Sequence, residues 1–459
     1  MILFAHSNFL VQDEKQIARM RPYAPLSTLT AAALVRSAGH RVALFDATFE
    51  TGIDAFERML GKIRPAIVAL MEDNFNFLTK MCTTVRRESA LAMIRLARDQ
   101  GCLVAVNGPD ASDHPEAYFD AGADVVIEGE GEATLLRVAG LWAGGERDLR
   151  QLPGLVLPGT GTTGPCRPER DLDSLPLPAW DLVDVESYRR AWGGKLSWNI
   201  AASRGCPYAC NWCAKPTFGR RYTVRSPGNV VEEMARLKSE VAPSHLWFTD
   251  DILGLNPGWI ESFASELSRR DAHIPFSMQS RVNLISPRVA AGLASAGAAE
   301  VWLGVESGSQ KILDAMDKGT KVGGARTATR LLRKNGIRVC WFIQLGYPSE
   351  EWEDILATRD LIADEMPDDI GVSVAYPLPG TAFYDRVRAQ LGARRNWHDT
   401  GDLAMLFQGT FETGFYRRIR DLLHRQAETC TIDAEAWQLL EDEAHSRRSP
   451  APMLVAAGS

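Results

Sequence analysis

Short apolar runs alternate with longer stretches of mixed polarity through the first 145 residues. Apolar runs of three to five residues predict buried strands, and the stretches between them are long enough for crossover helices. A regular alternation of this kind predicts a doubly wound, Rossmann-like parallel sheet. The predicted strands of this first domain, residues 1–145, are Ile2–Ala5, Val42–Phe45, Ala66–Leu70, Leu103–Val106 and Val125–Ile127.

The loops after these strands are candidate binding elements, because ligands of such sheets lie beyond the carboxyl ends of the strands. Two loops are rich in glycine, which lets the backbone approach a ligand closely: Asn107-Gly108-Pro109 and Glu128-Gly129-Glu130-Gly131-Glu132. Taken singly, each glycine is also explained by an ordinary turn. The candidate cofactor-binding residues of this domain are Asn74, Gly108, Glu128, Gly129 and Gly131.

The pattern changes in residues 146–195. Glycine and proline dominate Pro153–Pro168, and the Leu-Pro-Leu-Pro run within Asp171–Trp180 excludes a helix or a central strand. We interpret this segment as an interdomain linker that contains a small hairpin.

A second alternation of strands and helices fills residues 196–385 and predicts six β/α units. The predicted strands are Trp198–Ser203, Leu246–Phe248, Phe276–Gln279, Val301–Val305, Val339–Leu345 and Gly371–Ala375. The predicted helices are Val230–Glu240, Trp259–Arg270, Pro287–Ala296, Ala325–Lys334 and Glu351–Glu365. Residues 386–459 are expected to be a short helical region, with amphipathic segments near Tyr384–Leu391 and Phe415–Cys430 and a disordered tail at Ser449–Ser459.

Composition excludes several classes of protein. The net charge is −7, and acidic and basic residues are interspersed, so neither nucleic acid nor anionic lipid is an expected partner. No apolar run reaches the roughly 20 residues of a membrane span, and the N-terminus is typical of a first strand and not of a signal peptide. Eight cysteines, three in one loop and five scattered, do not form a disulfide framework. A reducing, cytoplasmic location is expected.

The three clustered cysteines lie in the run from Ser203 to Cys213, at Cys206, Cys210 and Cys213. A cubane iron–sulfur cluster takes one thiolate per iron, so three thiolates leave the fourth iron open for a substrate. Zinc would need a fourth Cys or His nearby, and the nearest candidates in the sequence are Cys166 and His245. The spacing therefore favours a cluster over a zinc site or three buried thiols.

The CxxxCxxC spacing, with Trp212 before the last cysteine, resembles the cluster loop of the radical S-adenosylmethionine (SAM) enzymes. The resemblance implies a [4Fe–4S] cluster on the three cysteines and a partial (β/α)6 barrel from the six predicted units. It also implies that the open iron binds SAM and that one electron cleaves SAM to a 5′-deoxyadenosyl radical. An external reductant such as flavodoxin or ferredoxin is expected to supply the electron.

Polar residues at the predicted strand ends can bind the charged and polar groups of SAM. Glu306 or Asp250 can balance cationic groups, and Arg281 can bind a carboxylate through two N–H groups. The runs Glu306-Ser307-Gly308 and Gly346-x-Pro348 resemble the fourth- and fifth-strand motifs of the family. Taken alone, Arg281 or Asp250 is equally explained as a structural ion pair, and no catalytic residue is assigned. The candidate SAM-binding residues are Trp212, Asp250, Gln279, Arg281, Glu306, Ser307, Gly346 and Pro348.

Two basic runs, Lys215-Pro216 and Gly219-Arg220-Arg221, follow the cysteine loop. They are expected either to tune the reduction potential of the cluster or to hold an anionic substrate. The alternative is an ordinary solvated turn. Trp212 is expected to face the ligand, because core packing explains an aromatic residue on this loop poorly.

The helix expected from Pro25-Leu26 to Ala38-Gly39-His40, together with the two glycine loops, resembles the cobalamin-binding domain upstream of many radical SAM domains. A nucleotide-binding or ligand-free domain is the alternative. The Asp-x-His-x-x-Gly string of histidine-ligated cobalamin domains is absent, so cobalt is expected to lack a histidine as its lower ligand. The segment Met71–Phe77 is expected to face the lower side of the cobalt instead. Three histidines, His6, His40 and His114, are expected to be solvated or at helix ends.

The two resemblances together imply a cobalamin-dependent radical SAM methyltransferase that acts on an unactivated carbon, or on phosphorus, of a small metabolite. In such enzymes one SAM supplies methyl through cobalamin and a second supplies the radical. A radical cyclase or rearrangement enzyme of the same architecture is the alternative, since the chain also resembles anaerobic porphyrin-ester cyclases. A corrinoid or cluster sensor without turnover is a hypothesis of another class. It is disfavoured because the C-terminal region shows no basic recognition helix.

Overall fold

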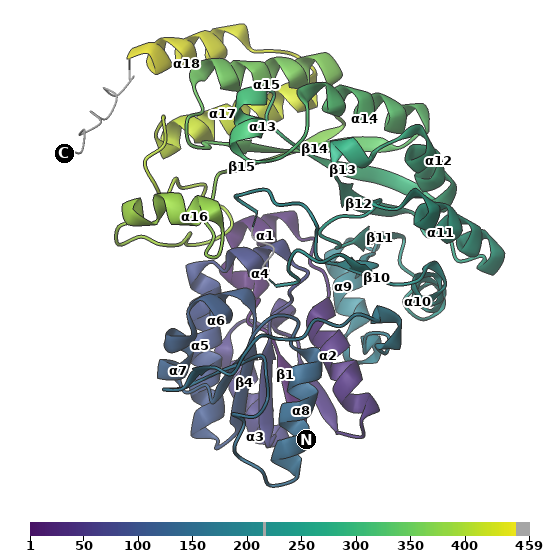
Figure 1. Ribbon diagram of the computed structural model, residues 1–459, viewed down its shortest axis with the longest axis vertical. Coiled ribbons are helices and arrows are strands. Elements are labelled where there is room, and N and C mark those ends of the chain that lie inside the picture. Colours follow the sequence, from purple (N-terminus) through teal and green to yellow (C-terminus); the bar gives the residue numbers. More distant parts are fainter. Residues whose placement is uncertain (214–216, 447–459) are drawn as a thin grey trace.

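The computed structural model describes residues 1–213 and 217–446, which form two α/β units, one above the other in Figure 1. The first unit contains a sheet whose five parallel strands follow the order β2-β1-β3-β4-β5. These strands are β1 (Ile2–Ala5), β2 (Val42–Phe45), β3 (Ile67–Met71), β4 (Leu103–Asn107) and β5 (Val125–Ile127). The predicted doubly wound sheet is confirmed, and its order places the topological switch point between β1 and β3.

The predicted hairpin is present as β6 (Leu155–Leu157) and β7 (Gly161–Thr162). It also extends the first sheet, because β6 pairs with β5 in antiparallel orientation. The first sheet is therefore mixed, with seven strands instead of five parallel ones. The physical reason is that β5 would otherwise expose an unpaired hydrogen-bonding edge, which the hairpin covers.

Helices cover both faces of the first sheet. On one face α2 (Leu26–Ser37) packs beside α8 (Glu132–Ala143), and on the other α3 (Ile53–Ile63) and α7 (Pro115–Ala121) flank α5 (Thr84–Asp99). Each face has its own apolar core. Three short helices follow strands β1, β3 and β4: α1 (Glu14–Arg19), α4 (Phe77–Met81) and α6 (Pro109–Asp113).

The second sheet is a curled half-barrel of six parallel strands in sequential order. Its strands are β8 (Ser197–Ile200), β11 (His245–Phe248), β12 (Phe276–Ser280), β13 (Ala298–Glu306), β14 (Arg338–Leu345) and β15 (Asp369–Val374). The helices on its outer side are α10 (Pro227–Glu240), α11 (Pro257–Arg270), α12 (Pro287–Ala296), α13 (Gln310–Ala315), α14 (Val322–Lys334) and α15 (Trp352–Glu365). The predicted partial barrel is confirmed.

Three of these helices begin with the same local signal. Ser226, Asn256 and Ser286 each accept a backbone N–H of the first helical turn, and each precedes a proline at the first helical position. Such a cap satisfies an otherwise unpaired donor, and proline has no N–H to satisfy. The sequence therefore fixes where α10, α11 and α12 begin.

The C-terminal region packs against the last strand of the half-barrel. It contains α16 (Ala382–Val387), α17 (Thr413–Thr429) and α18 (Ala434–Ser446), and α17 contacts β15. The prediction did not include α18, whose buried residues Trp437, Leu440 and Ala444 make only a narrow apolar stripe. The predicted disordered tail, Ser449–Ser459, lies outside the described residues. No described helix is long and apolar enough to cross a bilayer.

A buried group of three charges joins the two units. Arg204 of β9 (Ser203–Arg204) donates to Glu130 at 2.7 Å and to Glu132 at 2.8 Å, and all three side chains are less than 10% exposed. A second buried pair, Lys80 with Asp251 at 2.6 Å, joins α4 to the end of β11. These contacts hold the carboxyl ends of the first sheet against the cysteine-bearing side of the second.

Replacing Arg204 with methionine would leave two buried carboxylates without a counter-charge. We expect the free energy of unfolding to fall by about 3–5 kcal/mol at neutral pH, and by less at acidic pH, where Glu132, whose pKa is raised by burial, takes up a proton. Urea unfolding of the full chain measures this loss. The control is Arg36→Met, which breaks the exposed pair of Arg36 with Asp181 and should cost about 1 kcal/mol or less. Equal losses in the two variants would contradict the assignment.

Candidate functional site

The cysteine loop begins directly after β9 and is held between β9 and β10 (Thr223–Val224). Gly205 has a φ of +78°, and a Cβ there would overlap the carbonyl oxygen of Arg221, so the turn into the loop requires glycine. Cys206 is buried, whereas Cys210 and Cys213 are half-buried. The chain thus presents two of the three thiols toward accessible space.

Asn211, between the last two cysteines, fixes the loop to the half-barrel. Its amide donates to the carbonyl of Ala315 at 2.8 Å and to Asp317 at 2.7 Å, and its backbone N–H donates to Met316. The hydroxyl of Tyr347 donates to the Asn211 amide oxygen at 2.6 Å. Sequence reasoning passed over Asn211, and Tyr347 appeared only as the middle of a glycine motif.

The described residues contain no group of three His, Cys, Asp or Glu side chains close enough to hold a single metal ion. A cubane cluster does not need such a group, because each thiolate binds a different iron. All three cysteines lie on the one loop that leads from β9 to β10. The residues present therefore fit a cluster, and their role as its ligands stays a prediction.

Arg281 lies against the cysteine loop. Its Nη1 donates to the sulfur of Cys210 at 3.2 Å, its guanidinium stacks 3.9 Å above the ring of Tyr208, and its Nη2 donates to the carbonyl of Lys318. Its expected role in binding the carboxylate of SAM stays a prediction. The contact places a positively charged group directly beside the Cys210 sulfur.

Glu306 forms a buried ion pair with Lys318, at 2.6 Å and with both side chains 6% exposed. The ammonium of Lys318 lies 5.8 Å from the ring of Trp212. Trp212 is half-buried and packs against the large core, so core packing explains it better than we expected. Its indole N–H nevertheless has no partner among the described residues.

The Ser307-Gly308-Ser309 turn packs against α15. The N–H of Gly308 and the hydroxyl of Ser307 both bond the hydroxyl of Thr358, and a Cβ at Gly308 would overlap the carbonyl oxygen of Ala357. The turn therefore sets the distance between β13 and α15, whatever it binds.

Asp250 is fully buried, and this burial raises its pKa to about 6. It accepts hydrogen bonds from the backbone of Ala202 and the hydroxyl of Ser203, and Gln279 donates to its carbonyl oxygen at 2.8 Å. These donors are neutral and follow β8, so Asp250 ties the ends of β8 and β11 together, and its role toward SAM stays a prediction. The neighbouring Asp251 pairs with Lys80 instead.

Gly346 turns the chain after β14 with a φ of +74°, and its N–H donates to the carboxyl of Glu350 at 2.6 Å. The sulfur of Met405 lies 2.8 Å from the position of a Cβ at Gly346, so the C-terminal region covers this turn. Pro348, two residues on, is half-buried. Burial raises the pKa of Glu350 to about 8, which keeps the carboxyl protonated at neutral pH.

The raised pKa of Glu350 predicts a pH dependence of stability. Because the folded chain holds this proton more tightly than the unfolded chain, Glu350 lowers the stability as the pH rises from about 4.5 to about 8. Glu350→Gln can still accept the Gly346 N–H and has no charge to bury. We expect the free energy of unfolding of this variant, relative to that of the wild type, to increase as the pH rises through this range, by at most about 1.4 kcal/mol per pH unit. Urea midpoints at intervals from pH 5 to pH 8.5 measure it, and a pH-independent difference would refute it.

In the first sheet, three candidates gather around Asn107 at the end of β4. The Asn107 amide donates to the carbonyls of Ile127 and Gly129, at 2.8 and 3.1 Å, and its oxygen accepts from Asn74 at 3.0 Å. Gly131 has a φ of +83°, and a Cβ there would lie 2.7 Å from the Asn107 amide. Asn107 is thus the organising residue, although we had quoted it only as part of a glycine loop.

The remaining candidates of this domain lie against the protein's own side chains. A Cβ at Gly108 would lie 3.0 Å from the Cβ of Glu72, and one at Gly129 would lie 3.3 Å from the sulfur of Cys166. Glu128 accepts from the hydroxyl of Thr162 on the edge hairpin at 3.4 Å. Their role toward a cofactor stays a prediction.

One expectation about the histidines is wrong. His6 is buried at the end of β1, where its Nε2 lies 3.0 Å from Asp46 and its Nδ1 accepts the N–H of Asn8. It is neither solvated nor at a helix end, because β1 is buried between β2 and β3. His114 lies between α6 and α7, as expected, and His40 is half-buried.

The segment after β3 lies against the half-barrel. The ring of Phe75 is 4.7 Å from that of Phe218, which follows the cysteine loop, and Lys80 reaches Asp251. Figure 1 shows α4 between the two sheets. Lys215 and Pro216 lie outside the described residues, whereas Arg220 and Arg221 are exposed, as a solvated turn would be.

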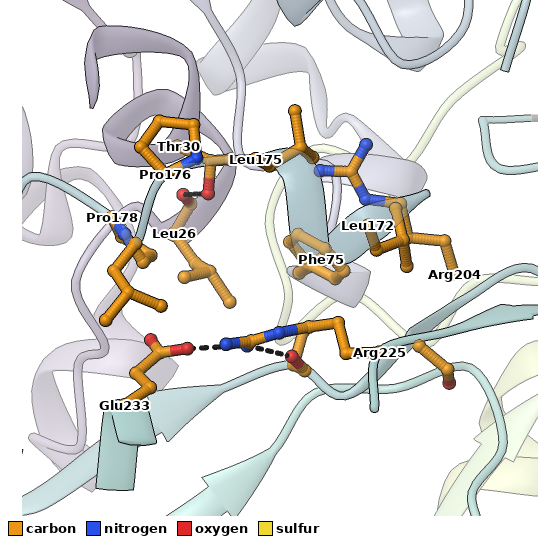
Figure 2. A pocket seen from close by; sticks show the side chains of 13 residues that line it. Leu26, Thr30, Phe75, Leu172, Leu175, Pro176, Pro178, Arg204, Arg225 and Glu233 are labelled. Carbon is orange, nitrogen blue, oxygen red and sulfur yellow. Dashed lines mark hydrogen bonds and ion pairs between the residues drawn. The ribbon is translucent and has the colours of Figure 1, made fainter. Parts of the chain in front are cut away.

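A pocket lies where the linker crosses between the two units (Figure 2). Phe75 and Arg204 line it, as does Arg225, which pairs with Glu233 at 2.5 Å. Most of the other lining side chains come from α2 and from the Leu-Pro-Leu-Pro run of the linker. None of the three loop cysteines lines it, so this pocket lies beside the candidate site and not within it.

Several buried polar atoms near the facing strand ends have no hydrogen-bond partner among the described residues. They belong to the segment after β3 and to the half-barrel: Asn74 Oδ1, Thr83 Oγ1, Arg86 Nη1, Trp212 Nε1, Thr217 Oγ1 and Gln344 Oε1. Unpaired buried groups are uncommon in native proteins.

Comparison with known proteins identifies the class. Residues 200–362 match the Radical SAM superfamily. This match identifies a radical SAM domain within the second unit.

Similar proteins extend over more of the chain. It is 27% identical over 383 residues to an uncharacterized methyltransferase of Pyrococcus horikoshii, covering 81% of this chain and 80% of the relative. It is 27% identical over 277 residues to the anaerobic magnesium-protoporphyrin IX monomethyl ester cyclase of Cereibacter sphaeroides, covering 58% of this chain and 45% of the cyclase. The radical SAM methyltransferase TsrM of Kitasatospora setae, solved with cobalamin and a [4Fe-4S] cluster, has the same fold, with a TM-score of 0.70 and 20% identity over 86% of this chain and 76% of TsrM.

Proposed function

We propose that the protein is a cobalamin-dependent radical SAM methyltransferase that acts on an unactivated carbon, or on phosphorus, of a small metabolite. The observation that carries the proposal is that the carboxyl ends of the doubly wound sheet are held against the cysteine loop, through Arg204 and Lys80. This arrangement would let one substrate contact both a cofactor bound to the first unit and a cofactor bound to the second. The protein is expected to work in the cytoplasm with a flavodoxin or ferredoxin as electron donor.

In this proposal Cys206, Cys210 and Cys213 hold a [4Fe–4S] cluster, which when bound supplies the electron that cleaves SAM. Asn211 and Tyr347 keep the loop fixed on the half-barrel. Arg281 donates to the Cys210 sulfur and thereby stabilises its negative charge. The Glu306–Lys318 pair lies beside Trp212, where Glu306 can exchange Lys318 for the ammonium of SAM.

The second candidate function is a radical cyclase or rearrangement enzyme. The observation that favours it is the similarity to the magnesium-protoporphyrin cyclase, which covers 58% of the chain. Such an enzyme needs the same electron and the same radical, but no transfer of a methyl group.

The cluster assignment predicts about four irons per chain after anaerobic reconstitution. The triple Cys→Ala variant of Cys206, Cys210 and Cys213 should lose the iron and the brown absorbance. Cys430→Ala is the matched control, because Cys430 is exposed and lies at the end of α17. A triple variant that keeps a full cluster would show that other residues hold the iron.

The products of SAM distinguish the two candidate functions. A methyltransferase of this kind consumes two SAM per turnover and releases S-adenosylhomocysteine and 5′-deoxyadenosine in comparable amounts. Reduced enzyme with methyl-labelled SAM and candidate substrates should therefore form both products, with label in the substrate. Substrate-dependent 5′-deoxyadenosine alone would favour the cyclase, because the radical would then form without methyl transfer.

A further inference from the structure

Two arginines that follow the cysteine loop, Arg220 and Arg221, carry charges that no acidic residue balances. Both residues are exposed, and neither guanidinium has an ion pair among the described residues. Arginines on the outer helices of the half-barrel do pair with carboxylates, as Arg288 of α12 does with Glu261 of α11. A single unpaired charge on a surface is ordinary, so the position of this pair has to show whether it has a role.

The two arginines lie against the first cysteine of the loop. The N–H of Cys206 donates to the carbonyl of Gly219 at 3.3 Å, and the carbonyl oxygen of Arg221 occupies the place that a Cβ at Gly205 would need. The backbone from Gly219 to Arg221 therefore packs directly on Gly205 and Cys206. Cys206 itself is buried, whereas the two arginines of the contacting segment are exposed. The chain thus reaches solvent, with positive charge, beside the buried cysteine.

The sequence around the loop is depleted of acidic residues. No aspartate or glutamate occurs from residue 187 to residue 231, although the whole chain has a net charge of −7. Arg204 and Arg225, at the two ends of the loop region, are each neutralised by buried glutamates. Among the described residues from 203 to 226, the charges left unbalanced are therefore those of the two arginines after the loop.

The form of this surface indicates the size of the partner. Small ligands bind in concave sites, and neither arginine lines the pocket between the two units (Figure 2). Two exposed like charges outside that pocket instead suit a protein with an acidic surface. Complexes between redox proteins are small and transient, and complementary charge steers their encounter. An acidic electron carrier has these properties.

We propose that Arg220 and Arg221 form the docking surface for the electron donor, an acidic flavodoxin. The inference rests on the proposed function, because only a chain that carries the cluster needs this donor. The docked flavodoxin faces the segment that packs on Cys206. Its anionic flavin hydroquinone loses one electron and becomes the neutral semiquinone, and the cluster gains that electron.

The test is the dissociation constant of a recombinant acidic flavodoxin for the full-length, reconstituted protein, measured by surface plasmon resonance. The double variant Arg220→Gln with Arg221→Gln should bind about fivefold to tenfold more weakly at low ionic strength, since two exposed charge pairs are lost. At about 1 M salt, where the Debye length is about 3 Å, variant and wild type should bind alike. Charge reversal, Arg220→Glu with Arg221→Glu, should weaken binding further at low ionic strength.

The matched control is the double variant Arg58→Gln with Arg95→Gln. It removes the same charge from exposed positions on α3 and α5, and neither arginine forms an ion pair among the described residues. Its dissociation constant should equal that of the wild type. The comparison separates an effect of charge beside the cysteine loop from an effect of net charge.

SAM cleavage with two reductants distinguishes docking from a role at the cluster or toward the substrate. With reduced flavodoxin below saturation, the Gln variant should form 5′-deoxyadenosine about fivefold to tenfold more slowly at low ionic strength. With saturating dithionite, which is small and needs no docking surface, variant and wild type should give equal rates. An equal loss with dithionite would overturn the inference, because the arginines would then act on the cluster, on SAM or on the substrate.

Failure of the inference and failure of the proposed function give different results. Wild-type protein that binds flavodoxin no better than the charge-reversal variant would overturn the docking surface, and 5′-deoxyadenosine formed with dithionite would leave the function standing. Reconstituted wild-type protein that forms no 5′-deoxyadenosine with dithionite would refute the proposed function, and the docking inference with it.

Discussion

The buried contact of Arg204 with Glu130 and Glu132 is the constraint on which the rest of the site depends. Arg204 stands two residues before Cys206, Glu130 lies on the loop after β5, and Glu132 is the first residue of α8. One interaction therefore fixes the start of the cysteine loop relative to the binding edge of the first sheet. Two carboxylates around one guanidinium satisfy more of its donors than a single pair would, which suits a contact that water does not reach.

The strands of the first sheet could be predicted because parallel strands covered by helices on both sides are continuous apolar runs. Those of the half-barrel could be predicted because they alternate regularly with helical stretches. The edge hairpin β6–β7 was predicted as a hairpin, but its pairing with β5 was not, since sequence does not say which edge needs a cover. The sequence did not predict α18, because its three buried residues form an apolar stripe too narrow to distinguish it from an exposed polar segment.

The candidate site was only partly predictable. Polar residues at strand ends were recognised by position, yet Asp250 and Ser307 turn out to bond neighbouring backbone and side chains. His6 was misjudged because a lone histidine shows no sign of its partner, which is Asp46 of the next strand. Arg86 was missed for a related reason. An arginine in the first turn of a helix is usually solvated, and only the packing of the two units reveals that this one is buried.

The unpaired groups and the paired ones divide the seam between the two units into two kinds of surface. Around Arg204 and Lys80 every charge has a close partner, so that surface contributes to stability in the protein alone. Around Arg86 and Asn74 single buried polar atoms have no hydrogen-bond partner among the described residues, so that surface contributes less to stability. The charge pairs of Arg204 and Lys80 are thus the contacts that hold the binding edge of the first sheet against the cysteine loop, because breaking a buried pair leaves an uncompensated charge.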